Sequence, residues 1–348
     1  MFMLIHLVEK FVIKLFLLIF NLLWYIIFVC YNIHIKNGDF MIFKNSVQLN
    51  YKNLEKVWKY FFFRVVIWGV IILLSLPAIL KFDSIISSNA KTYNLLGQFG
   101  SGFLYVKNYG LVLTNLFNCG FQILKDCFAT SAFLVVYFCV VFFLIRPFLM
   151  NIGKYTMNYM FYYYMSSHTR CKFLNTMICN FKEACSYSFF KSLLSFPVMV
   201  LNTVLCCLIL SVNNDVFTYL KPLIVIVIFI VIYSMFQSVI SGWAPAMIVL
   251  DCNVFKGFVK GISSSWKMIG MVLVNYLAMY LYYITVPFAF SIYTLLIVKP
   301  FIVFNIVTFE MIAFYNVQGM KYYVSKDSIV VPKKLEEIDK FKKSKYIL

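Results

Sequence analysis

The sequence predicts an all-α polytopic membrane protein: a transmembrane helical bundle of six spans, with an N-terminal seventh as one reading, and with amphipathic helices on the cytoplasmic side. The first observation is composition, since the 348 residues are 63% hydrophobic and 13% charged. A soluble chain is about half apolar and about a quarter charged. The composition therefore excludes a soluble domain, a disordered chain and a secreted disulfide scaffold.

The second observation is a set of apolar windows, each long enough to cross about 30 Å of hydrocarbon as a helix of about 20 residues. Six windows lie in the body of the chain: Phe61–Leu80, Ser131–Met150, Ser192–Val212, Leu223–Leu250, Met268–Phe290 and Ser291–Val317. The last two nearly abut, which places their turn near Phe290–Pro300.

The third observation is the distribution of basic residues, which gives the chain its net charge of +18. Four alternate connections (35–64, 146–191, 252–267 and 320–348) hold 23 Lys and Arg residues, whereas the connections between them hold six, Lys299 among them. Basic loops face the cytoplasm and its anionic lipid. We therefore expect a plasma-membrane protein with a cytoplasmic C-terminus, and the charge does not indicate a nucleic-acid partner.

The N-terminal segment 1–40 contains a further apolar window, Phe11–Cys30. This segment has three possible interpretations: an uncleaved span, a cleaved signal peptide, or sequence upstream of a true start at Met41. The residues before Tyr31 are too bulky for a signal cleavage site, which disfavours the second.

Basic amphipathic helices precede three of the spans, on the cytoplasmic side. In the first, Phe43, Val47, Leu54 and Trp58 share one face and Lys44, Lys52, Lys56 and Lys59 the other; segments beginning at Phe173 and Phe255 repeat the pattern. Each also carries a Phe-Lys pair, at Phe43, Phe181 and Phe255. The pattern divides the membrane domain, 41–319, into three helical-hairpin units, which a basic tail, 320–348, follows. Internal duplication would explain the repeated pattern, and so equally well would the basic, amphipathic composition expected of any inward loop near anionic lipid.

The long outer connection, 81–130, offers two weak candidates for chemistry. Gly97–Gly102 is glycine-rich but lacks the lysine and the strand-to-helix context of a phosphate loop. Cys119 and Cys127 both fall on the outer side and could pair. His168 and its neighbouring cysteines are spaced too irregularly for a zinc site, so we expect no metal or cofactor, and no catalytic motif is visible.

Charged and amide side chains within the spans are the candidate binding residues. Glu310 is the only acidic residue in a predicted span, and a buried charge there must be paired, protonated or functional. Arg64 and Arg146 lie at a similar inner depth. Asn202 and Asn275 add hydrogen-bonding capacity between helices. Pro197, and Pro245 beside Gly242, should bend their helices.

The layout resembles that of bacterial six-span membrane proteins of unknown function, including the membrane domain attached to some glycerophosphodiester phosphodiesterases. The likeness is one of pattern, carried by Phe43–Phe62, Phe255–Trp266 and Gly319–Tyr323. The phosphodiesterase catalytic domain is absent, so the resemblance implies no catalytic residue.

Two functions with candidate residues remain open from the sequence, and a third, a membrane-embedded enzyme, has no residues to name. One is a non-catalytic membrane component or accessory subunit, in contact with anionic lipid and a protein partner in the membrane. The other is a transporter of a small solute or lipid, with Glu310 in the inner half of the bundle.

Overall fold

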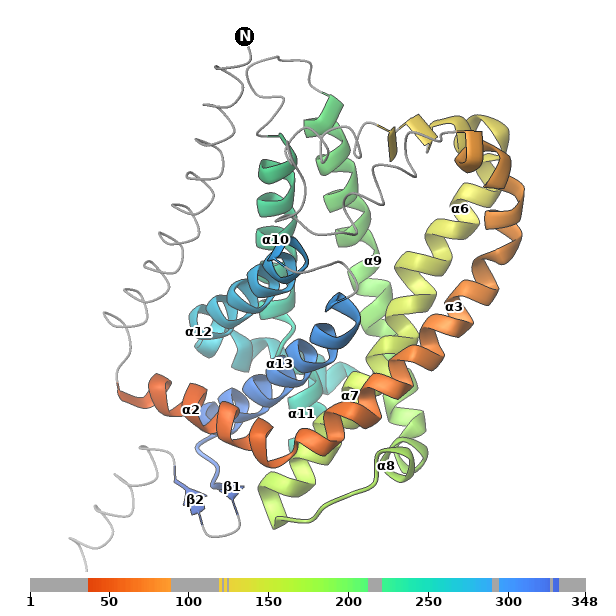
Figure 1. The fold of residues 1–348 in the computed structure, drawn as a ribbon. Coiled ribbons are helices and arrows are strands. Elements are labelled where there is room, and N and C mark those ends of the chain that lie inside the picture. The colour runs from red at the N-terminus through yellow and green to blue at the C-terminus, as the bar shows by residue number, and fades with distance from the viewer. Residues whose placement is uncertain are drawn as a thin grey trace, which may run out of the picture.

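The fold of the chain is shown in Figure 1 as a computed structural model. It describes residues 37–88, 119–120, 122–123, 125–211, 221–289, 294–325 and 328–331. The N-terminal window Phe11–Cys30, the glycine-rich segment Gly97–Gly102 and most of the tail lie outside these residues.

Helices form nearly all of the described chain. They are α2 (Asn37–Lys52), α3 (Leu54–Ser88), α6 (Ala132–Val140), the π-helical η2 (Val141–Ile145), α7 (Arg146–Ser167), α8 (Phe173–Cys179), α9 (Phe181–Ser211), α10 (Lys221–Val239), α11 (Trp243–Val249), α12 (Val254–Ala289) and α13 (Thr294–Gln318). Two short strands follow, β1 (Tyr322–Ser325) and β2 (Ser328–Val330).

The predicted all-α polytopic bundle is confirmed. Five stretches are long and apolar enough to cross a membrane: Leu54–Asp83, Ala132–Ser167, Phe181–Ile209, Ile224–Val249 and Val298–Gln318. Helix α12 is continuous where a further span was predicted, but Asn275 and four tyrosines make its described part more polar than these five. The protein is therefore a multi-pass membrane protein.

The second span is longer than the sequence predicted. Helices α6, η2 and α7 follow one another without a break from Ala132 to Ser167, whereas the apolar window ends at Met150. Residues 151–167 were interpreted as part of a basic cytoplasmic connection, and they are helix instead. The apolar pattern fades there because α7 meets other helices on most sides, with eleven buried residues including Thr156 and Asn158.

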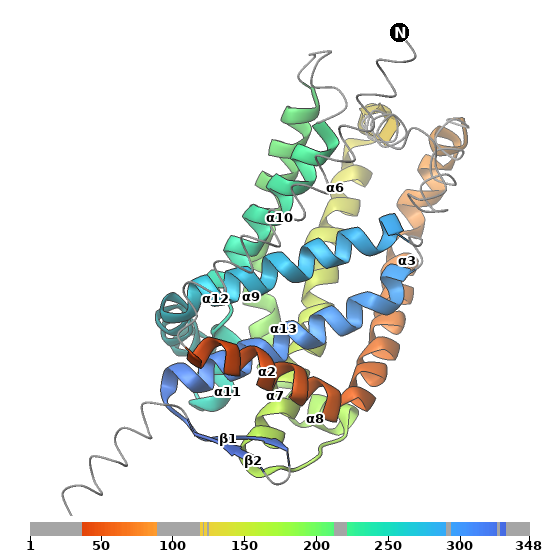
Figure 2. The same cartoon turned by 60° about the vertical axis from the view of Figure 1, so that its left-hand side comes forward.

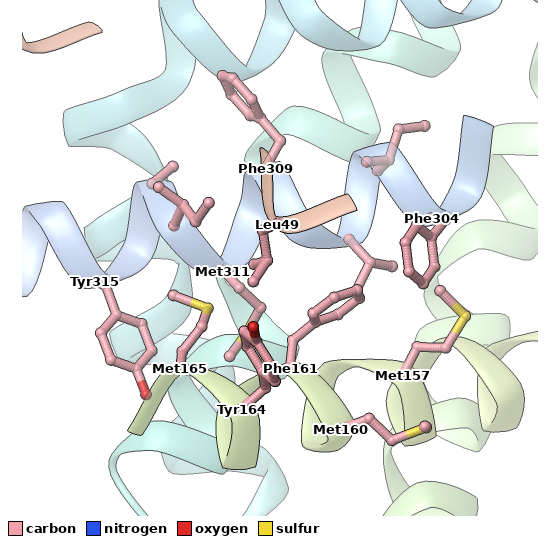
Figure 3. Close-up of a cluster of buried hydrophobic side chains, with 14 of the residues drawn as sticks. Leu49, Met157, Met160, Phe161, Tyr164, Met165, Phe304, Phe309, Met311 and Tyr315 are labelled. Carbon is pink, nitrogen blue, oxygen red and sulfur yellow. The ribbon is translucent and has the colours of Figure 1, made fainter. Parts of the chain in front are cut away.

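Helix α13 is the central helix of the bundle. In its most apolar window 72% of the residues are buried inside the protein, against 11–39% in the other four candidate spans. The largest core cluster joins it to α2 and α7, and Figure 3 shows Leu49 of α2 directed towards side chains of the other two helices, among them Phe161 and Met311. The rings of Phe161 and Phe304 meet edge-on, 4.9 Å apart.

The hairpin formed by α12 and α13 stops part-way along α3, well short of the far end of that helix (Figure 2). The ring of Phe301, near the start of α13, lies 6.2 Å from that of Trp58, near the start of α3. Ser88 lies 30 residues beyond Trp58, about 45 Å along a straight helix. Lys299 was counted with the outer connections, and this is wrong, because it lies at the level of the first turns of α3.

Asparagine marks the start of three long helices. Asn53, Asn180 and Asn253 immediately precede α3, α9 and α12. The side chains of Asn53 and Asn180 each donate to a carbonyl four residues back, that of Leu49 and that of Thr176, at 2.9 Å, where the preceding helix ends. The Phe-Lys pairs do not share this position, since Phe43 lies ten residues before its asparagine while Phe181 and Phe255 follow theirs.

The predicted disruption at Gly242 and Pro245 is confirmed as a break between α10 and α11. The Gly242 N–H donates to Ser265 Oγ of α12 at 2.9 Å. A Cβ at Gly242 would lie 2.6 Å from the Gly261 carbonyl oxygen, and one at Gly261 would lie 2.6 Å from Trp243 Cα. Two glycines therefore let α11 and α12 cross in backbone contact. Pro197 lies inside α9, which continues past it from Phe181 to Ser211, so no break forms there.

A strand pair follows α13, where the sequence predicted only a basic tail. Strand β1 pairs with β2 in antiparallel order and packs against α7 and α2. Tyr322 is buried, and its hydroxyl accepts hydrogen bonds from Asn45 at 3.0 Å and from Asn316 at 3.2 Å. Burial raises the pKa of Tyr322, so the hydroxyl stays neutral. This contact fastens α2 to the chain after α13.

Candidate functional site

Glu310 lies in a buried polar group formed by four helices. Its carboxylate pairs with Lys154 Nζ of α7 at 3.0 Å and accepts a hydrogen bond from the Tyr276 hydroxyl of α12. Lys154 Nζ also donates to that hydroxyl at 3.3 Å. The Glu310 side chain is only 2% exposed and that of Lys154 is 11% exposed. Pairing resolves the cost of the buried carboxylate that the sequence identified.

Helix α9 adds a second lysine to this group. Lys191 is 4% exposed, and its Nζ donates to the Tyr187 hydroxyl at 2.8 Å. It is close enough to Lys154 for the two ammonium groups to repel, and close enough to Glu310 to be attracted. We refer to Glu310, Lys154, Lys191, Tyr187 and Tyr276 as the Glu310 cluster. It holds two ammonium groups and one carboxylate.

Arg64 of α3 is buried without enough partners for its guanidinium. It is 6% exposed, and its Nε and Nη1 atoms have no hydrogen-bond partner. Its guanidinium carbon lies 5.9 Å from the centre of the Tyr60 ring. An unpartnered buried charge is costly, so its presence needs a reason other than packing.

Arg146 of α7 and Lys299 of α13 lie within electrostatic range of Arg64 and of each other. Both are half-buried, with the Arg146 guanidinium 4.6 Å from the centre of the Trp68 ring and Lys299 Nζ 4.9 Å from that of Tyr283. Cations stack favourably on aromatic faces in this way. We refer to Arg64, Arg146 and Lys299 as the cation cluster.

Helix geometry places the cation cluster two to three turns from the Glu310 cluster. Arg146 and Lys154 are eight residues apart on α7, about 12 Å along its axis, and Lys299 and Glu310 are eleven apart on α13, about 16 Å. Tyr280 lies between them, its ring 5.8 Å from that of Tyr276 and 5.4 Å from that of Tyr233. Tyr233 in turn interacts electrostatically with Arg146. Polar side chains thus follow one another along the inside of the bundle.

Three of the five predicted site residues belong to these two clusters. Asn202 and Asn275 belong to neither cluster. The Asn202 side chain donates to the Phe229 carbonyl of α10 at 3.2 Å, which ties α9 to α10 as a structural amide would. Asn275 is 6% exposed and adjoins Tyr276 on α12.

Lys154, Lys191, Lys299, Tyr187 and Tyr276 were missed as site residues. The lysines fall near the ends of apolar windows, where a lysine is interpreted as a loop residue. The two tyrosines are among 25 in the chain and carry no local signal. A signal was present on α7, since Arg146 and Lys154 are eight residues apart and so share one face of any helix that continues past Met150.

Interior lysines and arginines also change the charge count. Six basic residues of the count lie inside the bundle. Five of them contributed to the 23 inward residues and Lys299 to the six outward ones; the five are Lys56, Arg64, Arg146, Lys154 and Lys191. Without these six residues the counts are 18 and five, so the predicted orientation does not change.

Much of the apolar surface of the amphipathic helices points outwards, although Val57 and Phe173 are buried in the core. Exposed positions include Val47 on α2, Ile178 on α8, and Phe255, Val259 and Trp266 on α12, each at 46–69%. Lys56 was assigned to the polar face of the first such helix, and this is wrong. It is 2% exposed and lies over the rings of Phe161 and Tyr164, because the bundle core lies on the side of α3 that carries Lys56, Tyr60 and Arg64.

Cys119 and Cys127 are free thiols in the structure, so the pairing that the sequence left open is not formed. Within the described ranges, no group of three or more His, Cys, Asp and Glu side chains could hold a metal ion.

Comparison with known proteins adds nothing to this geometry. No family model, curated sequence or solved structure matches the chain. The two clusters are therefore the evidence on which a function rests.

Proposed function

We propose that the chain is a transporter of the plasma membrane that carries a small anionic solute. The observation that supports it is the excess of positive charge inside the bundle. Glu310 is the one carboxylate among the buried ionisable side chains of the described residues, whereas Arg64, Lys56 and Lys191 are buried basic side chains. Lys154, Arg146 and Lys299 add to the positive side.

This excess has a direct electrostatic consequence. Charges inside a membrane protein are costly unless they pair with one another or with a substrate. The Glu310 carboxylate pairs with Lys154 and also attracts Lys191. Within the described residues, no ion pair joins Arg64, Arg146 or Lys299 to an acid. A positive interior raises the local concentration of anions and excludes cations. An anion moving between the cation cluster and Lys191 would supply the missing charge at each end of the path.

The Glu310 cluster would then close the inner part of the path. The cytoplasmic end carries the break between α10 and α11, and broken helices near binding sites occur in many transporters. A solute anion that reached Lys191 would compete with Glu310 for Lys154 and so loosen the contact between α7 and α13. With the C-terminus on the cytoplasmic side, this contact lies in the inner half of the bundle.

An accessory role in the membrane is the second candidate, favoured by the exposed apolar residues of α2, α8 and α12. Those side chains, flanked by lysines, suit the surface of an anionic membrane or a partner within it. A role of that kind needs no path through the bundle and gives the interior cations no function.

Transport can be tested with the purified protein reconstituted in liposomes. Uptake of a panel of radiolabelled anions (inorganic phosphate, sulfate, glycerol 3-phosphate and succinate) would be compared with uptake by protein-free liposomes. We expect saturable uptake of at least one anion and none of it in the Lys191→Met variant. If folded protein carries no anion of the panel, the transport proposal fails and the accessory role is favoured.

A further inference from the structure

We propose that the cation cluster is a binding site for a phosphate group. The site consists of Arg64 from α3, Arg146 from α7 and Lys299 from α13, three segments far apart in the sequence. The proposal deepens the proposed function by naming the class of its anion, yet it does not require transport, because a phosphate could be held there without being carried across.

The first argument is charge. Three cations lie within electrostatic range of one another, and no carboxylate is among the groups that act on Arg146 or Lys299. Like charges gathered in a bundle repel, and burial adds the cost of lost hydration. An anion bound among them removes both costs, whereas packing alone would favour apolar side chains at the same positions.

The second argument is hydrogen bonding. Arg64 is more than nine-tenths buried, and its Nε and Nη1 donors are unsatisfied. Buried donors in native proteins nearly always have a partner, so two on one guanidinium indicate an absent acceptor. The Nε and Nη donors of arginine form a fork that matches two oxygens of a phosphate, and two arginines with a lysine can satisfy a doubly charged group.

The third argument is that aromatic rings position the other two cations. The Arg146 guanidinium lies against Trp68 and the Lys299 ammonium against Tyr283. Tyr283 also interacts electrostatically with both arginines. These contacts hold the cations in place without neutralising them, so their charge remains available to a ligand.

Thermal unfolding of purified protein in a neutral detergent tests the site. Inorganic phosphate and short-chain phosphatidic acid would be titrated separately, with sodium chloride at matched ionic strength as the control. A phosphate group in the site should raise Tm by about 5 °C at a concentration about 100-fold above its dissociation constant. Stabilisation by inorganic phosphate identifies a soluble ligand, and stabilisation by phosphatidic acid alone identifies a lipid head group.

Variants separate binding at this site from binding elsewhere. The shift should disappear in Arg64→Met and Arg146→Gln and persist in Lys182→Gln, which removes an exposed lysine of α9. Without ligand, Arg64→Met should melt at the same temperature as the wild type or higher, because it removes an unpartnered charge. Equal shifts with chloride, equal shifts in all variants, or a large loss of Tm in ligand-free Arg64→Met would each overturn the proposal. Binding without anion uptake would leave the site standing and remove only the transport proposal.

Discussion

Glu310 depends on Lys154 and Tyr276, and the dependence is mutual. Removing the carboxylate leaves Lys154 and Lys191 close to each other without an acid. Removing Lys154 leaves the carboxylate with a tyrosine hydroxyl and the more distant Lys191. Breaking one side of a buried pair is much more costly than removing both charges together. The ion pair is therefore a property of two residues and should be tested as one.

We predict that Glu310→Gln lowers the free energy of unfolding by about 3 kcal/mol. Lys154→Gln should cost a similar amount, and the double variant should cost less than the sum, because neither charge is then left unpaired. Unfolding in detergent, followed for all four proteins of this cycle, measures the coupling. Glu55→Gln is the control, since Glu55 is exposed at the start of α3 and its loss should change stability by less than about 0.5 kcal/mol. Strict additivity would mean that the two side chains do not interact.

At the residue scale, the sequence identified those site residues whose charge stands out in an apolar window. Glu310, Arg64 and Arg146 stand out in this way. Lys154 and Lys191 were hidden, because a window ends where charges begin, and a helix that continues beyond it cannot be distinguished from a loop by hydropathy. Lys299 was misassigned because a sequence shows where a hairpin turns but not how deep the turn lies in the bundle.

At the scale of the elements, the crossing of α11 and α12 depends on missing side chains. Gly242 and Gly261 bring two backbones together, and Met247 lies equally close to Gly257, where a Cβ would meet its Cγ at 2.3 Å. Close approach of this kind is a common use of small residues between membrane helices. The contacts between α11 and α12 fix the position of α12 and therefore the point where Tyr276 meets Glu310.

We predict that Gly261→Ala destabilises the protein by about 1–3 kcal/mol, because the new methyl group would overlap the backbone of Trp243. Gly270→Ala on the same helix is a matched control. Nothing lies within 4 Å of a Cβ there, so the replacement should be neutral or stabilising by up to about 1 kcal/mol. Melting temperatures of the two variants give the comparison, and equal effects would show that the crossing is looser than the structure indicates.

The sequence predicted most helices but not their ends. Apolar windows located the hydrocarbon-facing part of each helix, which is what hydropathy measures. They could not locate the buried extension of α7, whose residues face other helices, or the strand pair at Tyr322, whose short strands carry no run of apolar residues. The amphipathic pattern before the first span is present, but most of its apolar residues point outwards, where lipid would surround a membrane protein. The side that faces the core carries Lys56 and Arg64.

For the whole molecule, the distribution of basic loops predicts which side each end occupies. The short hairpin of α12 and α13 does not alter this, since α12 leaves from and α13 returns to the same end of the bundle (Figure 2). We predict that a reporter fused after Leu348 is cytoplasmic and one inserted at Thr218 is external, both positions lying outside the described residues. Alkaline phosphatase activity and fluorescent-protein emission report the two sides. An external Leu348 would reverse the orientation and place Glu310 in the outer half.

The central claim is that the cations inside the bundle, rather than those on its surface, act on an anion. Uptake of the best anion of the panel by proteoliposomes tests it most directly, with interior variants Arg146→Gln and Lys299→Gln compared with surface variants Lys182→Gln and Lys260→Gln. Loss of a charge-assisted hydrogen bond is worth roughly tenfold to a hundredfold. We predict uptake lower by at least about tenfold in the interior variants and within about twofold of wild type in the surface variants. Equal uptake by all four folded variants would contradict the claim.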